Sequence, residues 1–174
     1  MLDALLWLMG NPELKSVTAT SGIHYANEIG SLKDSGALTG EVHSQSEFKP
    51  EEMNVEDFSS GSMLFENGAR VNFTVAWAAN MPDKSDIRII GQNKGIYIPE
   101  CKLYSGAGKT EDLKPVENLY PDSVFPGHIY LMDNLRKVLK GEEKPVVTPE
   151  ETINVSRIIE AVYKSANTGK EVIL

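Results

Sequence analysis

The sequence contains 174 residues, with 17 lysines and arginines against 25 aspartates and glutamates, so its formal net charge is −8. This acidic balance argues against a protein that binds the phosphate backbone of nucleic acids. The single cysteine excludes an intramolecular disulfide scaffold, and no apolar run approaches the roughly 20 residues that cross a bilayer. We therefore expect one soluble, cytoplasmic domain over residues 1–174, with enough chain to bury a core.

The first ten residues predict a short helix, because Leu2, Leu5, Leu6 and Met9 recur at helical spacing before Gly10-Asn11-Pro12. The segment lacks the basic flank and the small-residue cleavage site of a signal peptide. No N-cap residue precedes Leu2, so the helix begins abruptly, as it would if it were cut from a longer chain.

A β-hairpin is the clearest signal in the chain, because Asn67-Gly68 separates two runs of strand character within residues 55–78. Its second strand alternates large apolar residues with small and polar ones, which predicts one face on a core. The large residues are Val71, Phe73, Val75 and Trp77. Before the hairpin we expect a strand over residues 14–20 and a glycine-rich excursion from 21 to about 54.

Short strands and then helices follow the hairpin. The strands are expected over residues 86–90, 95–98, 101–104 and 112–116, with glycine-rich turns between them. One helix carries the apolar stripe Leu131, Leu135, Val138 and Leu139, and a second, opened by a capping box at 148–151, carries Val155, Ile158, Ile159, Val162 and Ala166. A terminal strand covers 171–174. This order predicts an α+β fold with helices on one face of a largely antiparallel sheet.

The usual catalytic signatures are missing from the sequence. The stretch Ser105 to Thr110 ends like a phosphate-binding loop, but Leu103 replaces its first glycine and no helix follows, so a hairpin turn is the favoured interpretation. The three histidines and Cys101 are not in metal-ligand spacing, so no metal site is predicted. No nucleophile–base pair supports a hydrolase.

Three side chains have both a functional and a structural interpretation. Asp3 either binds a ligand hydroxyl group or stabilises the N-terminus of its helix. Trp77 either stacks on a ligand or continues the apolar stripe of its strand. His128, near the start of a helix, is either an acid–base group or a solvated side chain.

Five groups of residues occur in a familiar order along the whole chain. They are residues 3–12, Val55-Glu56-Asp57 with residues 65–69, Gly91 with Gly95, residues 141–151, and Ala161, Tyr163, Ser165, Gly169 and Val172. This order resembles that of the C-terminal half of the Gfo/Idh/MocA family, the oxidoreductases related to glucose–fructose oxidoreductase and inositol dehydrogenase.

The resemblance implies an α+β domain with a largely antiparallel, mixed sheet and helices packed on one face. Family members begin with a Rossmann domain that binds NAD or NADP, and their catalytic lysine, aspartate and histidine precede the region matched here. The histidine would stand immediately before Met1, so no catalytic and no cofactor-binding residue is expected among the 174, and the dinucleotide-binding domain is expected to be absent.

For the substrate, the resemblance implies contacts from Asp3, from Trp77, Asn80 and Met81 after the long strand, and from His128. We expect the substrate-binding and oligomerisation domain of an NAD(P)-dependent dehydrogenase for a sugar or polyol-like molecule, inactive without its Rossmann domain. The alternative is a stand-alone, non-catalytic binding or scaffold module. A homodimer through the sheet is also expected, because Ile87 and Ile89 oppose Arg88 and Ile90 and neither face is wholly polar.

Overall fold

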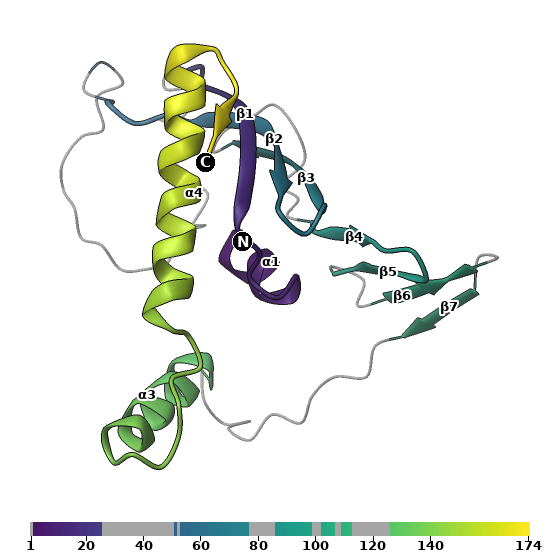
Figure 1. The fold of residues 1–174 in the computed structure, drawn as a ribbon, viewed down its shortest axis with the longest axis vertical. Helices are drawn as coiled ribbons and strands as arrows, with labels where there is room; N and C mark the ends of the chain where they lie inside the picture. Colours follow the sequence, from purple (N-terminus) through teal and green to yellow (C-terminus); the bar gives the residue numbers. More distant parts are fainter. Residues whose placement is uncertain are drawn as a thin grey trace, which may run out of the picture. The chain divides into compact units, whose positions relative to one another are not determined.

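The computed structural model describes residues 2–25, 51, 53–76, 86–98, 102–106, 109–112 and 126–174 (Figure 1). The chain forms two compact units, which are described separately below. Unit 1 comprises residues 1–81 and 150–174, and unit 2 comprises residues 82–149. None of the helices in the described ranges is long and apolar enough to cross a membrane.

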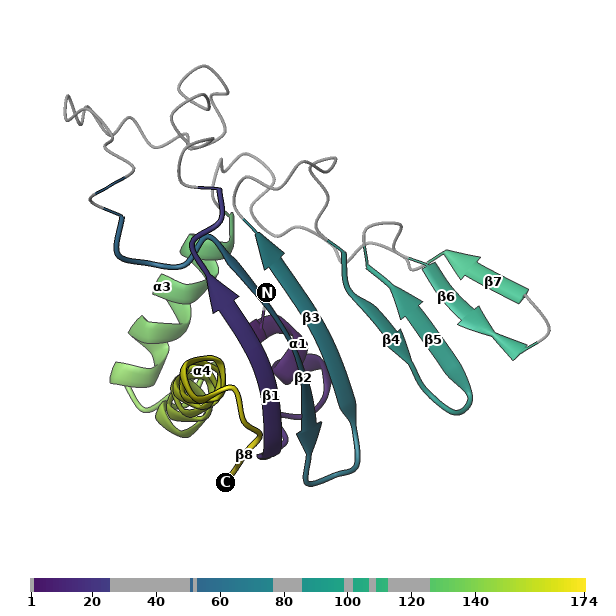
Figure 2. The same ribbon diagram turned by 90° about the horizontal axis from the view of Figure 1, so that it is seen from above.

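Unit 1 is a four-stranded antiparallel sheet with two helices. Its strand order is β3-β2-β1-β8, and Figure 2 shows β1, β2 and β3 side by side with α4 seen nearly end-on beside β1. The elements are α1 (Leu2–Leu8), β1 (Leu14–Gly22), β2 (Phe58–Phe65), β3 (Arg70–Ala76), α4 (Pro149–Thr168) and β8 (Val172–Ile173). The predicted first helix, first strand, hairpin and terminal strand are all confirmed.

The core of unit 1 lies between the sheet and both helices. Its buried apolar side chains come from α1, β1, β2, α4 and β8. Val71 and Phe73 of β3 are partly buried and pack against them. The buried members are Leu6, Leu14, Val17, Met63, Phe65, Ile158, Ala161 and Val172. Helices on one face of an antiparallel sheet are therefore observed, and the predicted α+β class is confirmed.

Two details of the predicted core are wrong. Val75 is 58% exposed, because it aligns with Ser59 and Ser21 in a row of the sheet beyond the apolar cluster. On α4, Ile159 is exposed and Ala161 is buried instead. A helix advances about 100° per residue, so the face that contains Ile158 also contains Ala161 and leaves Ile159 outside.

Gly61 allows the middle of the sheet to pack closely. It pairs with Ala19 on one side and Phe73 on the other. A Cβ atom at this position would lie 2.5 Å from the Thr18 carbonyl oxygen and 2.9 Å from Cε1 of the Phe73 ring. The absence of a side chain at residue 61 therefore lets the Phe73 ring cover the β2 backbone.

Unit 2 contains a second antiparallel sheet, with strand order β4-β5-β6-β7, and the helix α3. The elements are β4 (Arg88–Ile90), β5 (Lys94–Tyr97), β6 (Lys102–Ser105), β7 (Lys109–Asp112) and α3 (Pro126–Leu139). The strand predicted over 112–116 is misplaced, since β7 begins at Lys109, inside the segment assigned to the turn.

The apolar residues of unit 2 are less buried than those of unit 1. On the sheet, Ile89 aligns with Ile96 and Leu103 along one face, and all three are half-buried. On α3, Leu131 and Leu135 of the predicted stripe are exposed. The helix ends as the sequence predicts, because Gly141 adopts a φ of 74° just after the last turn.

Candidate functional site

The helix α1 presents Asp3 to solvent. Leu6 is fully buried, and Leu2 and Met9 pack on the same core, so this apolar side of the short helix is anchored. Asp3, in the first turn, is exposed, and Trp7 is 65% exposed. Residues four apart share a helix face, so a carboxylate and an indole are neighbours on the outer side of α1.

This pair has the chemistry of a site for a polyhydroxylated ligand. A carboxylate accepts hydrogen bonds from hydroxyl groups, and an indole offers a large apolar face with a polar N–H at its edge. Trp7 was not among the residues expected to bind substrate. Its spacing of four residues from Asp3 is the signal that would have identified it.

The other expected substrate residues are in different places. Trp77, Asn80 and Met81 lie outside the described residues, since β3 ends at Ala76 and the description resumes at Asp86. His128 lies in the first turn of α3 and is exposed. Asp3 belongs to unit 1 and His128 to unit 2.

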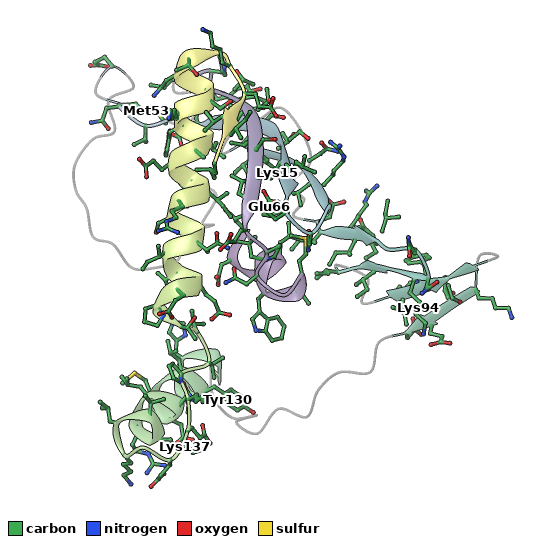
Figure 3. The ribbon with its side chains drawn as sticks, in the orientation of Figure 1. Lys15, Met53, Glu66, Lys94, Tyr130 and Lys137 are labelled. Atoms are coloured by element: carbon green, nitrogen blue, oxygen red, sulfur yellow. The ribbon has the colours of Figure 1, made fainter. Side chains whose placement is uncertain are left out.

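A groove of about 430 Å³ lies along α3 in unit 2. Figure 3 labels two of its lining residues on that helix, Tyr130 and Lys137. The Lys137 ammonium group lies 2.8 Å from a Glu143 carboxylate oxygen and 3.3 Å from one of Asp133. The Asn134 side chain donates to Glu143 and accepts from the Val146 N–H. These bonds hold the segment after α3 against the helix.

The charges along α3 shift one another's pKa values. Hydrogen bonds from Arg136 and then Lys137 lower the pKa of the Asp133 carboxyl group, and the bond from Lys137 lowers that of Glu143. The two carboxylates in turn raise the pKa of Lys137, with the hydrogen bond to Glu143 as the largest single cause, followed by the hydrogen bond to Asp133. All of these groups are solvated, so they orient the helix end and contribute little stability.

In unit 1, Asp57 is a buried carboxylate that the sequence analysis did not single out. Its side chain is 1% exposed, and its two oxygens accept the backbone N–H groups of His24 at 2.8 Å and Tyr25 at 2.6 Å. The Asp57 N–H donates to the Gly22 carbonyl oxygen. This residue therefore joins the segment that leaves β1 to the segment that enters β2. The His24 ring lies edge-on to the Phe58 ring.

Two residues of α4, Tyr163 and Ser165, form further hydrogen bonds to this part of unit 1; together with Glu56 and Asp57 we call them the framework residues. The Tyr163 hydroxyl group donates to a Glu56 carboxylate oxygen at 2.6 Å, and that bond raises the pKa of Tyr163. The fully buried Ser165 Oγ accepts from the Ala19 N–H at 2.9 Å and donates to the Lys170 carbonyl oxygen at 2.7 Å. The β8 strand pairs with Ser16 and Val17 of β1 but does not reach Ala19. The Ser165 hydroxyl group therefore accepts the Ala19 N–H in place of a strand carbonyl group.

The sequence signal for these contacts was present but was interpreted only as resemblance. Glu56, Asp57, Tyr163 and Ser165 all belong to the motifs quoted for the family. The structure shows why they occur together: they join β1, β2 and α4. They are framework residues, and the exposed face of α1 remains the candidate ligand site.

Two site types that the sequence raised, a metal cluster and a phosphate-binding loop, can be compared with the structure. No three His, Cys, Asp or Glu side chains within the described ranges gather closely enough to hold a metal ion. The glycine-rich stretch after Leu103 joins two strands, because Ser105 pairs with Lys109 across the β6–β7 hairpin. The hairpin interpretation is therefore confirmed, and the phosphate-loop interpretation is wrong.

Known proteins resemble the chain over its whole length. The family model described as "Oxidoreductase family, C-terminal alpha/beta domain" matches residues 1–174. D-glucoside 3-dehydrogenase of Escherichia coli (strain K12) is 26% identical over 176 residues, which cover 99% of this chain and 46% of that protein. The chain thus spans about half the length of this curated relative.

Solved structures share the fold. The aldose-aldose oxidoreductase from Caulobacter crescentus, complexed with glycerol, has a TM-score of 0.68 at 23% identity and covers 99% of this chain and 44% of its own. The WlbA dehydrogenase from Bordetella pertussis, in complex with NADH and UDP-GlcNAcA, has a TM-score of 0.61 at 18% identity. The match covers 99% of this chain and 42% of the dehydrogenase. Given the family match over every residue, the chain belongs to the Gfo/Idh/MocA oxidoreductases, as their C-terminal alpha/beta domain.

Proposed function

We propose that the chain is the substrate-binding and oligomerisation domain of a cytoplasmic, NAD(P)-dependent dehydrogenase that acts on a sugar or polyol-like substrate. The family match over residues 1–174 is the observation that carries this proposal. The names of three similar proteins support the substrate class, since they refer to a D-glucoside, an aldose and UDP-GlcNAcA.

The substrate would contact the exposed face of α1. The Asp3 carboxylate would accept hydrogen bonds from vicinal hydroxyl groups, and the Trp7 indole would pack on the C–H face of a sugar ring. Trp77, Asn80, Met81 and His128 remain part of this proposal as expected from the sequence. A rigid helix is a good platform for such a site, because both side chains keep a constant spacing.

Hydride transfer also requires a nicotinamide cofactor and a base on the substrate hydroxyl group. The described residues do not fit a dinucleotide: all of their strand pairs are antiparallel, whereas dinucleotides bind where a helix begins after a strand of a parallel sheet. We therefore propose that NAD or NADP is bound outside these 174 residues, and that these residues alone do not oxidise a sugar.

Titrations of the 174-residue chain test this function. D-Glucose and glycerol should shift the amide signals of α1 in NMR spectra, with saturation at millimolar concentrations. Asp3→Asn should weaken D-glucose binding at least tenfold, whereas Asp112→Asn, a change at an exposed carboxylate of β7, should leave it unchanged. Saturable NADH binding in the micromolar range would contradict the proposal, and so would sugar-induced shifts confined to unit 2.

A homodimer through the sheet belongs to the same proposal. The face of β1–β3 that points away from the helices carries short polar side chains in aligned rows, which can approach a second copy closely. These rows are Thr18, Ser62 and Asn72, and Thr20, Ser60 and Thr74. The half-buried Phe58 and Leu64 lie on the same face at the two ends of β2. The contact would combine these apolar ends with hydrogen bonds between the polar rows.

A substitution that places one positive charge at the centre of that face tests whether the chain dimerises through the sheet. Ser62→Arg places a long cation on the middle strand and should yield a monomer by light scattering at tens of micromolar. Ser156→Arg, on an exposed part of α4, should leave the mass of the dimer unchanged. A monomeric mass for the unmodified chain would contradict this part of the proposal.

A further inference from the structure

The turn between α1 and β1 is tied to α4 by one side chain. The Asn154 Nδ2 group donates to the Asn11 Oδ1 atom at 2.9 Å and to the Pro12 carbonyl oxygen at 3.1 Å. The residues it joins lie more than 140 positions apart in the sequence. Both bonds come from one amide group of a half-buried residue, so a single side chain connects the turn to α4.

The turn itself has a constrained backbone. Gly10 and Asn11 both have positive φ angles, 78° and 52°. The Asn11 N–H donates to the Leu6 carbonyl oxygen at 2.7 Å, and the Gly10 N–H donates to that of Trp7 at 3.1 Å. This is the Schellman arrangement that ends a helix. It makes α1 and residue 11 one rigid body, so a bond to Asn11 also restrains the helix.

Packing alone does not determine the direction of α1. Leu6 and its apolar neighbours hold the helix against the core, but apolar attraction is not directional, and a short helix can tilt about such an anchor. Hydrogen bonds do have a preferred direction. A helix of seven residues is roughly 10 Å long, so a tilt of about 10° at the turn moves its first residue by almost 2 Å.

We propose that Asn154 is a positioning residue for the ligand site: by holding Asn11 and Pro12 it sets the direction of α1 and so the place of Asp3. This inference rests on the proposed function for its consequence, since Asp3 is the proposed substrate contact. Displacements of about 1 Å at a binding or catalytic group can cost on the order of 100-fold in activity. A residue at the opposite end of α1 from Asp3 therefore contributes to binding without touching the ligand.

The test is Asn154→Asp, which keeps the shape of the side chain but cannot donate to either oxygen. Residual dipolar couplings of the Leu2–Leu8 amide groups report the direction of α1 against an alignment tensor fitted to α4 and β1–β3. We expect α1 in the variant to rotate by about 10° or more, and D-glucose binding to weaken at least tenfold. Asn11→Gly removes only one of the two bonds and keeps the positive φ, so it should give a smaller rotation.

Val155→Ala is the matched control, because it destabilises the same turn of α4 through the core without touching residues 11 and 12. It should lower the melting temperature and leave the direction of α1 unchanged. Couplings of α1 that coincide in Asn154→Asp and the unmodified chain would overturn the proposal. The couplings do not depend on sugar, so absence of D-glucose binding by the unmodified chain would contradict the proposed function alone, while a rotated α1 would still support the role of Asn154.

Discussion

Every fully buried side chain among the described residues lies in unit 1, whereas residues 86–149 of unit 2 contribute none. Unit 1 closes its sheet with two helices from opposite ends of the chain. In unit 2 the apolar face of the sheet and the stripe of α3 stay half-buried or exposed. The contrast indicates that α1 belongs to the more tightly packed of the two units.

The polar groups of the two units differ in the same way. In unit 1, the side chains of Asp57 and Ser165 are buried and form hydrogen bonds to backbone groups. In unit 2, Asp86 meets the Arg88 guanidinium at 2.9 Å on the surface, where Arg88 also lies over the Tyr97 ring. Buried polar groups are costly to disrupt, and solvated ion pairs are not, so equivalent substitutions should have unequal effects.

The largest difference is expected for the same residue type at two extremes of burial. Ile158 is 0% exposed in unit 1 and Ile90 is 93% exposed in unit 2. Ile158→Ala should lower the free energy of unfolding by about 2–5 kcal/mol because it leaves a cavity. Ile90→Ala should change it by less than about 0.5 kcal/mol. Urea unfolding followed by circular dichroism measures both, and similar losses would remove the basis of the comparison.

Two carboxylates give the next contrast. Asp57→Asn replaces one of the two accepting oxygens with an NH₂ group, so one of the two backbone N–H donors loses its acceptor and the change should cost about 2–3 kcal/mol of stability. Asp86→Asn weakens a surface ion pair and should cost less than about 1 kcal/mol. Hydrogen exchange of the His24 and Tyr25 amide groups locates the effect: it should accelerate in Asp57→Asn only. Unchanged exchange there would refute the role assigned to Asp57.

Gly61 and Gly106 form a third pair. Gly61→Ala forces the new methyl group against the Thr18 carbonyl oxygen and the Phe73 ring, and the resulting strain should cost about 1–3 kcal/mol. Gly106 has no atom within 4 Å of a Cβ position, so Gly106→Ala should be close to neutral. Melting temperatures compare the two. A neutral Gly61→Ala would show that the middle of the sheet relaxes easily.

The smallest effect concerns pH and α3. The hydrogen bond from Arg136 holds the pKa of Asp133 below its ordinary value of 3.8. Ionised Asp133 therefore stabilises the folded state above that value, and the contribution is lost as the pH falls through the lower, folded-state pKa. Arg136→Gln should raise the pKa of Asp133 in a carboxyl-carbon NMR titration, and Arg157→Gln on α4 should not. An unchanged titration in Arg136→Gln would exclude this bond as the cause.

Local patterns predicted much of the fold. Alternating apolar residues and Asn67-Gly68 predicted the β2–β3 hairpin, and helical spacing before Gly10-Asn11-Pro12 predicted α1. These features depend on neighbours in sequence, and the Asn67 side chain indeed accepts the Ala69 N–H within its own turn. The boundary of β7 was missed because a glycine-rich segment is compatible with either a turn or a short strand.

The candidate site was predicted less completely. Asp3 was identified from its position in an apolar helix, but Trp7 was not, although it lies one turn further along the same face. Three of the expected substrate residues, Trp77, Asn80 and Met81, fall outside the described residues and stay a prediction. No local pattern pointed to Asn154, because its role depends on a turn at the other end of the chain.

The sequence by itself determined the element types, the α+β class and the family, because periodicity, turn residues and motif order are properties of the linear chain. Only the tertiary structure decided which polar residues became framework: Asp57 fastens β1 to β2, Ser165 replaces a strand partner, and Asn154 orients α1. Each of these bonds joins segments that are distant in sequence. The strength of these hydrogen bonds depends on how deeply the donor and acceptor are buried and on the angle between them. Both are set only when the sheet and the two helices pack together.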